Sequence, residues 1–293
     1  MAHVPVLLEE TLSLLAVRAG GVYLDGTLGL GGHAAEILRR SAPGGRVIAF
    51  DKDASALALA REALSPFGER VRFVHADFRE APRVLGKECF DGILLDLGVS
   101  SLQLDAPERG FSFRADGPLD MRMDQGQGPT AADLVNRLPE DELANLIYRF
   151  GEERASRRIA RAIAEARKRK HFATTAELAA VVRRAAGRSR RPGLDPATRT
   201  FQALRIAVNG ELDGLEQALE DLAARLKPGG RLAVIAFHSL EDRAVKQTFR
   251  ALAKGGGHAL VTKKPVRPSE AETQTNPRAR SARLRALEKE AAA

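Results

Sequence analysis

Four short apolar runs that each end in an aspartate constrain the fold of this chain more than any other feature. The runs, given with their last residue, are GVYLD (Asp25), RVIAFD (Asp51), VRFVHAD (Asp77) and FDGILLD (Asp96). The first three aspartates recur every 26 residues, the length of a compact strand–helix unit. Helical stretches lie between the runs, at 33–40 and 54–64. This alternation predicts an α/β fold with an open, doubly wound, Rossmann-like parallel sheet, and it places the aspartates on the rim where such sheets bind ligands.

A mostly helical segment interrupts this sheet between its fourth and fifth strands. Residues 98–129 are rich in Gly, Asp and Pro and too long for an ordinary connection, and helical periodicity then continues over 139–191. The sheet resumes with the apolar run RLAVIAF at 231–237. We therefore predict two domains, a discontinuous sheet domain over 1–103 and 199–293 and a helical insert over 104–198.

Local patterns predict further elements. One helix is expected over 153–170, and a second opens with a capping box from Thr174 to Glu177 and ends at Gly187. Apolar residues that alternate steps of four and three predict a single helix over 208–226. The remaining expected elements are a helix over 240–253 and two last strands over 259–262 and 281–287, separated by a Pro/Ser/Glu-rich stretch.

The net charge of +8 is distributed unevenly along the chain. Residues 1–148 hold 15 basic and 22 acidic side chains, a net of −7, whereas residues 149–205 hold 16 and 5, a net of +11. Arginine supplies 36 of the 46 cations, which suits bidentate contact with phosphates. The basic segment therefore indicates either a polyanionic partner or a solvated arginine-rich face.

Several classes of protein are excluded by composition. The single cysteine, Cys89, rules out an internal disulfide framework and a metal site built from several thiolates. The histidines are scattered without ligand spacing, so we predict no metal. Neither a signal-like start nor a run of about 18 apolar residues occurs, which predicts a soluble, cytoplasmic protein with no membrane partner. The oligomeric state is left open.

A glycine-rich turn leads from Asp25 into the first predicted helix of the sheet domain, through DGTLGLGGH. Glycines allow a ligand to approach the backbone, and Asp51, which follows Gly31 by 20 residues, can accept both hydroxyls of a ribose. Four carboxylates at strand tips suit a ligand with an amine and a sulfonium, such as S-adenosylmethionine (SAM). A nicotinamide dinucleotide would leave Asp77 and Asp96 unused. Phe78 either forms an apolar wall for adenine or belongs to the core, with Asp77 capping a helix.

Nine segments resemble the bacterial 16S ribosomal RNA cytosine-N4 methyltransferases (the RsmH, formerly MraW, family) along nearly the whole chain. They are HVPVLLEE from His3, DGTLGLGGH from Asp25, DGILLDLGVSS from Asp91, RGFSF from Arg109, DGPLDMRMD from Asp116, GEER from Gly151, TRTFQALRIAVN from Thr198, PGGRLAVIAFHSLEDR from Pro228 and NPRARSARLR from Asn276. The resemblance implies a class I SAM-dependent methyltransferase fold and methylation of a cytosine amine in the decoding region. Its implied cofactor contacts are Gly31, Gly32, His33, Asp51, Phe78, Asp96 and Gln103. Leu102 departs from the proline usual in the family.

The reacting groups are harder to predict than the cofactor contacts. An acceptor aimed at the N–H bonds of the cytosine amine would stabilise the charge that develops there. Asp96 is a candidate for this acceptor, but the sequence after it lacks the Pro-Pro-aromatic motif of amino-methyltransferases, which favours contact with the cofactor instead. Candidate substrate contacts are Arg109, Phe111, Phe113, His238 and Ser239. Phe111 and Phe113 either stack on the base or form loop core, and His238-Ser239 either position substrate or are structural, with the serine capping a helix.

The basic insert is the expected RNA-facing element. Four arginines occupy neighbouring turns of the helix predicted over 153–170, and they either contact phosphates or form a solvated face. They are Arg154, Arg157, Arg158 and Arg161. We therefore expect a SAM-dependent enzyme that methylates N4 of a cytosine in 16S ribosomal RNA, either free or within the small ribosomal subunit. The alternatives are a SAM-binding RNA scaffold without catalysis and a nicotinamide-dependent oxidoreductase.

Overall fold

The structure, a computed structural model, describes residues 5–187, 193 and 195–291. Within the chain, two compact units are distinguished, one made of residues 1–98 and 214–293 and the other of residues 99–213. The first contains the sheet and is called the sheet unit below; the second contains the helices between the fourth and fifth strands and is called the insert. His3 and the end of the predicted helical periodicity, residues 188–191, lie outside the described residues.

The sheet unit is built around seven strands in the order β3-β2-β1-β4-β5-β7-β6. The strands are β1 (Val22–Asp25), β2 (Arg46–Asp51), β3 (Val71–His75), β4 (Phe90–Asp96), β5 (Leu226–Ala236), β6 (His258–Leu260) and β7 (Arg283–Lys289). The first five are parallel, and β7 runs antiparallel to both β5 and β6. The predicted α/β class is confirmed, and Asp25, Asp51 and Asp96 each end a strand.

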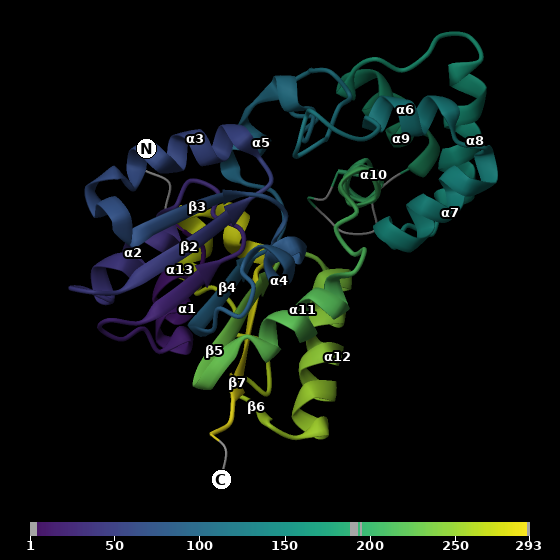
Figure 1. Cartoon of the computed structure of the whole chain (residues 1–293). Helices are drawn as coiled ribbons and strands as arrows, with labels where there is room; N and C mark the ends of the chain where they lie inside the picture. Colours follow the sequence, from purple (N-terminus) through teal and green to yellow (C-terminus); the bar gives the residue numbers. More distant parts are fainter. Residues whose placement is uncertain (1–4, 188–192, 194, 292–293) are drawn as a thin grey trace. The chain divides into compact units, whose positions relative to one another are not determined.

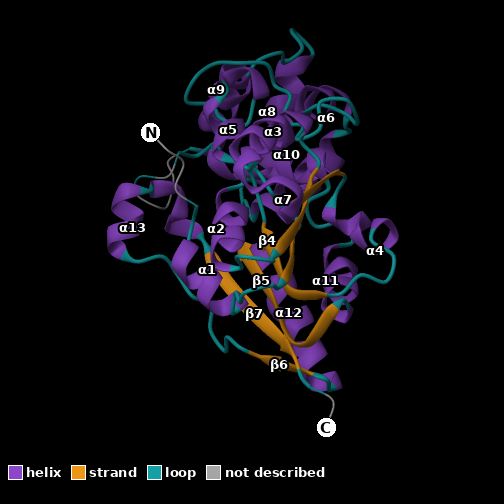
Figure 2. Cartoon of the chain, turned by 60° about the vertical axis from the view of Figure 1, so that its left-hand side comes forward, coloured by secondary structure: helices purple, strands orange, loops and turns teal. Residues whose placement is uncertain are grey.

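Helices cover both faces of this sheet (Figures 1 and 2). On one face, α1 (Leu8–Leu15), α2 (Gly32–Arg40) and α3 (Ala54–Ala63) contribute Leu12, Ile37 and Leu57 to a core shared with the strands. On the opposite face lie α4 (Ala81–Val84), α11 (Leu215–Ala224) and α12 (Ser239–Gly255). Apolar strand residues are thus buried on both sides, which explains why the strand sequences are almost continuously hydrophobic.

The insert is helical and has its own hydrophobic core. Its helices are α5 (Ser101–Asp105), α6 (Ala131–Arg137), α7 (Glu140–Gly151), α8 (Ser156–Arg167), α9 (Thr175–Ala186) and α10 (Thr198–Asn209). Leu143, Ile163 and Leu204, from three of these helices, are fully buried in one cluster. A separate core is what permits a segment of this size to fold as a unit.

The unit boundaries differ from the predicted domain ends. The helix α10, which we assigned to the sheet domain, packs on α7, and its Phe201 and Leu204 belong to the core of the insert. The prediction of one helix over 208–226 is wrong. The chain turns between α10 and α11, where Gly210 and Gly214 adopt positive φ angles of 55° and 65° that an L-residue rarely adopts.

Other predicted elements are shifted rather than missing. The helix expected over 153–170 begins at Ser156, and the third strand ends at His75, two residues before Asp77. The Pro/Ser/Glu-rich stretch before β7 contains α13 (Glu270–Thr275), whose Glu272 accepts a hydrogen bond from the Leu7 backbone amide. Within the described part of the chain, we find no helix with both the length and the apolar character needed to cross a membrane.

Candidate active site on the rim of the sheet

The carboxyl groups of Asp25, which is buried, and Asp96, which is partly buried, lie at the ends of the neighbouring strands β1 and β4, held by one residue of the glycine-rich turn. The backbone N–H of Thr27 donates to Asp25 Oδ1 at 3.1 Å, and its hydroxyl oxygen accepts a hydrogen bond from the Asp96 backbone N–H. The parallel pairing of β1 with β4 brings the two strand ends to the same edge. Thr27 thereby connects the two aspartates, and their side chains lie close enough to repel each other.

These two carboxyl groups hold protons more tightly than ordinary aspartates. Burial raises the pKa of Asp25, which is 1% exposed, to about 7, and the negative charge of Asp51 adds to this effect. Burial also raises the pKa of Asp96 to about 8, assisted by the charges of Asp25 and Glu241. The cause is the cost of removing a carboxylate from water next to other carboxylates. At neutral pH a substantial fraction of each group is therefore protonated.

The two oxygens of Asp96 have different surroundings. The Asp96 side chain is 25% exposed, and its Oδ2 lies 3.7 Å from Nδ1 of His33. Its Oδ1 is buried and finds no hydrogen-bond donor among the residues that the structure describes. Because an unsatisfied buried oxygen costs free energy, its presence at a strand end marks a position for a ligand to donate a hydrogen bond.

His33 is oriented by the segment before α1. It is buried in the first turn of α2, and its Nε2 lies 3.1 Å from the Val6 carbonyl oxygen. A carbonyl oxygen can only accept a hydrogen bond, so Nε2 carries a proton and the other ring nitrogen, Nδ1, faces Asp96. The His33 ring therefore lies beside Asp96, another residue for which the family resemblance implies contact with the cofactor.

Asp51 stabilises the glycine-rich turn from the end of β2. Its Oδ2 accepts a hydrogen bond from the Gly29 amide at 2.7 Å, and its Oδ1 accepts one from the Asp53 amide at 2.8 Å. Burial raises its pKa, whereas the two amides act in the opposite direction. The carboxylate is half-buried and so is accessible to a ligand.

The glycines of the turn are required by geometry. Gly31 has a φ of 79°, and a Cβ on Gly32 would lie 2.5 Å from Cγ of Pro5. Larger side chains at either position would therefore strain the backbone or push away the segment before α1. The turn thus places backbone that carries no side chains at the strand ends, as the sequence pattern predicts.

Asp77 has the capping role that we considered as the alternative, and Phe78 is buried beside it. Asp77 caps a 3-10 turn, Phe78–Glu80, and accepts hydrogen bonds from the backbone and the guanidinium of Arg79. Lys52 lies 3.8 Å from the same carboxylate. Phe78 is buried with the Arg79 guanidinium 5.0 Å from its ring centre. The charge of Asp77 is thus compensated within the sheet unit.

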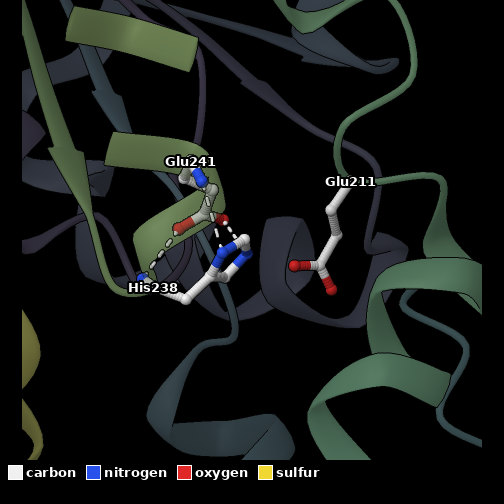
Figure 3. A group of neighbouring side chains, drawn as sticks. All are labelled: Glu211, His238 and Glu241. Carbon is white, nitrogen blue, oxygen red and sulfur yellow. Dashed lines mark hydrogen bonds and ion pairs between the residues drawn. The ribbon is translucent and has the colours of Figure 1, made fainter. Parts of the chain in front are cut away.

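His238 caps the helix that follows β5, a role we had considered for Ser239. Nδ1 of His238 accepts a hydrogen bond from the Glu241 backbone N–H at 3.3 Å, and Glu241 Oε2 accepts hydrogen bonds from the amides of Phe237 and His238. Figure 3 shows the His238 ring beside the Glu241 carboxylate, with 3.2 Å between Nε2 and Oε1. Glu211, also drawn there, belongs to the insert, where it binds Arg205 through two hydrogen bonds of 2.8 Å. Ser239 is the first residue of α12.

In the insert, three of the predicted site residues take part in local packing. Gln103 forms a reciprocal capping box with Ser100 at the start of α5. Arg109 is 7% exposed and donates hydrogen bonds to the carbonyl oxygens of Arg122 and Met123. Phe111 is buried in the core of the insert. The loop-core alternative therefore describes how Phe111 packs, and Arg109 holds the loop together.

Phe113 also packs on the insert core, but less deeply. Its ring contacts the Phe201 ring edge-to-face at 4.6 Å, and the Arg183 guanidinium lies 5.3 Å from its centre. Arg183 in turn forms an ion pair with Asp195 at 2.9 Å. Phe113 is half-buried in this arrangement.

The four arginines that we predicted on neighbouring turns of one helix have different surroundings. Arg157 donates to the Asp141 carbonyl oxygen and Asn145 side chain of α7, and Arg161 lies 3.5 Å from the carboxylate of Glu140. Arg158 donates instead to the carbonyl oxygen of Ala186 at the end of α9, at 2.8 Å. Arg154 precedes α8 and is exposed. All four side chains are at the surface of the insert, where such contacts are weak and exchangeable.

Sequence reasoning overlooked two residues of the rim. Thr27, which links Asp25 to Asp96, lies inside the glycine-rich motif, but no residue spacing in the sequence indicates its role. Glu241 had a signal, because a cap residue followed three positions later by glutamate is the capping-box spacing, here with His238 in place of Ser or Thr.

The rim can hold SAM. Its residues offer carboxylates for a ligand's amine and hydroxyl groups, glycine backbone for close approach, and one buried oxygen to which no described residue donates a hydrogen bond. Asp25 and Asp96 would also favour a cation, because positive charge relieves the repulsion between them. The donor set therefore fits this cofactor.

Known proteins that resemble this chain are methyltransferases. A family model described as the MraW methylase family matches residues 1–290. "Ribosomal RNA small subunit methyltransferase H" of Sorangium cellulosum is 56% identical over 287 residues, which cover 97% of this chain and 90% of the relative. The protein of the same name in Gloeobacter violaceus is 58% identical over 284 residues, covering 97% and 87%. A solved rRNA methylase from Streptococcus thermophilus is 14% identical with a TM-score of 0.47, covering 99% of this chain and 100% of that one.

Proposed function

This chain belongs to the MraW methylase family, and on that premise we propose that it methylates the exocyclic N4 amine of a cytosine in the decoding region of 16S ribosomal RNA. It is a SAM-dependent rRNA methyltransferase with the class I fold of these enzymes. When bound, SAM supplies an electrophilic methyl group. The proposal goes further in naming the cytosine amine and the residues that act on it.

The observation that carries the proposal is the buried Oδ1 of Asp96. The lone pair of a cytosine amine is delocalised into the ring, so the nitrogen becomes a nucleophile only when the enzyme orients it. An oxygen that accepts a hydrogen bond from this amine orients it and stabilises its developing positive charge. Asp96 Oδ1 is an acceptor of this kind, at a strand end and without a donor among the described residues. We assign the catalytic role to Asp96.

The residues that hold the cofactor follow from the family and the rim. Gly31 and Gly32 give its carboxyl-bearing end access to backbone N–H groups, Asp51 accepts the ribose hydroxyls, and Phe78 supports the adenine. His33 and Asp96 complete the set in the sheet unit. Gln103 belongs to the insert, where its side chain accepts a hydrogen bond from the Ser100 amide, and its cofactor contact is proposed from the family resemblance alone.

We assign RNA binding to the insert. The surface positions of its arginines and the net charge of +11 over 149–205 support phosphate contacts. Stacking on the target base is assigned to Phe113 rather than Phe111, because Phe113 is the less buried of the two. His238 and Ser239 are assigned to the substrate side of the rim. We expect the enzyme to act in the cytoplasm on the small ribosomal subunit, with the target base flipped out of any helix.

The test is transfer of labelled methyl from SAM to small ribosomal subunits and to free 16S ribosomal RNA that lack the modification. We expect label on one cytosine, at N4, as located by mass spectrometry of nuclease fragments. Label on a ring carbon or on another base would overturn the N4 assignment. Binding of SAM and RNA without any label would favour the scaffold, and calorimetric binding of NAD in place of SAM would favour the oxidoreductase.

A further inference from the structure

We infer that His33 is a positioning residue that acts through Asp96. When Asp96 accepts a proton from the target amine, His33 takes up the proton that Asp96 already carries. This inference rests on the proposed function. The first observation is the orientation of the ring. Nε2 donates a hydrogen bond to the Val6 carbonyl oxygen, and Nδ1 faces Asp96 Oδ2 at 3.7 Å.

The geometry favours a proton between these two side chains. A neutral His33 presents the lone pair of Nδ1 to Asp96, and an ionised Asp96 presents the lone pairs of Oδ2, so the two would repel each other. One proton, on Oδ2 or on Nδ1, converts this repulsion into attraction. The separation exceeds that of a hydrogen bond, as is common for catalytic pairs before substrate binds.

The surroundings of Asp96 favour placing this proton on the carboxyl group. Asp25 faces it from β1 and Glu241 from α12, and both are acidic. His33, from α2, is the basic group in contact with it. Burial and the two acidic neighbours raise the pKa of Asp96, which leaves Oδ2 protonated and Oδ1 free to accept a hydrogen bond at neutral pH.

The proton movements then balance. As the amine nitrogen gains its methyl group, one N–H bond breaks, its electron pair stays on nitrogen, and the proton bonds to Asp96 Oδ1. The O–H bond at Oδ2 breaks at the same time, and that proton bonds to Nδ1 of His33. Asp96 keeps one proton throughout, and His33 becomes an imidazolium whose Nε2–H remains bonded to the Val6 carbonyl oxygen. Solvent then removes one proton to restore the resting pair.

This scheme makes a specific prediction for His33→Asn. The asparagine side chain retains hydrogen-bonding groups near the position of Nδ1 but cannot take up a proton, so only ionised Asp96 can accept the amine proton in the variant. The deficit in kcat should therefore grow about tenfold for each pH unit below the pKa of Asp96, which is about 8 before ligands bind. It disappears to within about threefold at pH 9, where Asp96 is ionised.

The pH profile separates this role from a structural one. We would measure kcat at saturating SAM and RNA from pH 6 to 9, and SAM affinity separately by calorimetry. His258→Asn is the matched control, because His258 is also in the sheet unit with Nε2 near a carbonyl oxygen, at 3.5 Å from that of Ala223. Its profile should match that of the wild type. A His33→Asn deficit that is the same at every pH would overturn the inference.

A measurement without substrate or cofactor covers the case in which His33→Asn fails to fold. Nitrogen NMR of the His33 ring in the wild-type protein should show Nε2 protonated and Nδ1 unprotonated at pH 7, and the Nδ1 resonance should shift as Asp96 loses its proton near pH 8, a step that Asp96→Asn abolishes. A wild-type ring without that step, or a step that persists in Asp96→Asn, would overturn the inference. If Asp96→Asn instead retains full activity, the catalytic role of Asp96 in the proposed function fails first.

Discussion

The two units of this chain use charge in opposite ways. The sheet unit buries carboxyl groups at its strand ends, where Asp25 and Asp96 have pKa values of about 7 and 8. The insert places arginines at its surface, where Arg157 and Arg161 make contacts that water and salt can replace. Burial shifts the pKa of a carboxyl group, so that it gains or loses a proton near neutral pH. An exposed guanidinium keeps its charge and attracts anions over a longer range. Local chemistry and long-range attraction thus require different placements of charged side chains.

The largest effect is expected from Asp96→Asn, which tests whether buried carboxyl groups carry the chemistry. Asparagine keeps an acceptor oxygen but cannot take up the amine proton, so kcat should fall about 1,000-fold, within the range of general acid–base catalysis. Single-turnover methylation at saturating SAM measures this effect. RNA affinity should remain that of the wild type, and a parallel loss of RNA binding would contradict the division between the units.

The second effect concerns the cofactor. Asp51→Ala removes the acceptor assigned to the ribose and the bonds to Gly29 and Asp53, so SAM affinity should fall about 30-fold or more, because hydrogen bonds to a charged group contribute roughly 1.5–3 kcal/mol each. Titration calorimetry measures the change. Glu220→Ala, an exposed acid of α11, is the control and should bind SAM normally. Equal losses in both variants would argue against a specific contact.

The third effect is on stability and depends on pH. The pKa of Asp25 is raised by folding, so its contribution to stability is fully present below about pH 4 and is lost as the pH rises through about 7. Asp25→Asn avoids burying that charge. Its free energy of unfolding, measured by urea denaturation, should therefore exceed that of the wild type at pH 8 by on the order of 1–2 kcal/mol, with no gain near pH 4. A gain of equal size at both pH values would show that the charge is not its cause.

The smallest single effects are expected in the insert. Arg154→Ala and Arg161→Ala should each weaken RNA binding a few-fold and lower the slope of log affinity against log salt by about 0.7–0.9. Filter binding over a salt series measures both quantities. Arg250→Ala, an exposed arginine of α12 in the sheet unit, serves as the reference. If all three variants have the same slope, the insert is not the principal phosphate-binding surface.

The sequence was sufficient to predict those parts of the molecule in which the pattern of apolar and polar residues follows directly from burial and exposure. Buried parallel strands are apolar throughout and end where the chain meets solvent, so Asp25, Asp51 and Asp96 were recognisable as strand ends. Sequence could not show that Asp96 Oδ1 lacks a donor or that His33 faces Oδ2. Those facts depend on the relative positions of β4, α2 and the segment around Val6.

One error has a physical explanation. The apolar spacing over 208–226 continues through the turn at Gly210 and Gly214, because both α10 and α11 need an apolar face, and periodicity alone does not distinguish one helix from two.

The burial of Arg109 was also beyond reach of the sequence, since arginines are mostly exposed. Two carbonyl oxygens, those of Arg122 and Met123, accept its hydrogen bonds. Its contact with substrate stays a prediction.

The position of β7 determines when the sheet can be completed during synthesis. This strand follows all the others in the sequence, yet it lies between β5 and β6, and its Leu284 belongs to the core shared with α1 and α2. The described residues of the insert contribute no strand to this sheet, so its helices can pack while the ribosome is still translating the part of the sheet unit that follows residue 213. The nascent sheet has an open edge at β5 until β7 emerges, and in that interval it is exposed to unwanted strand pairing.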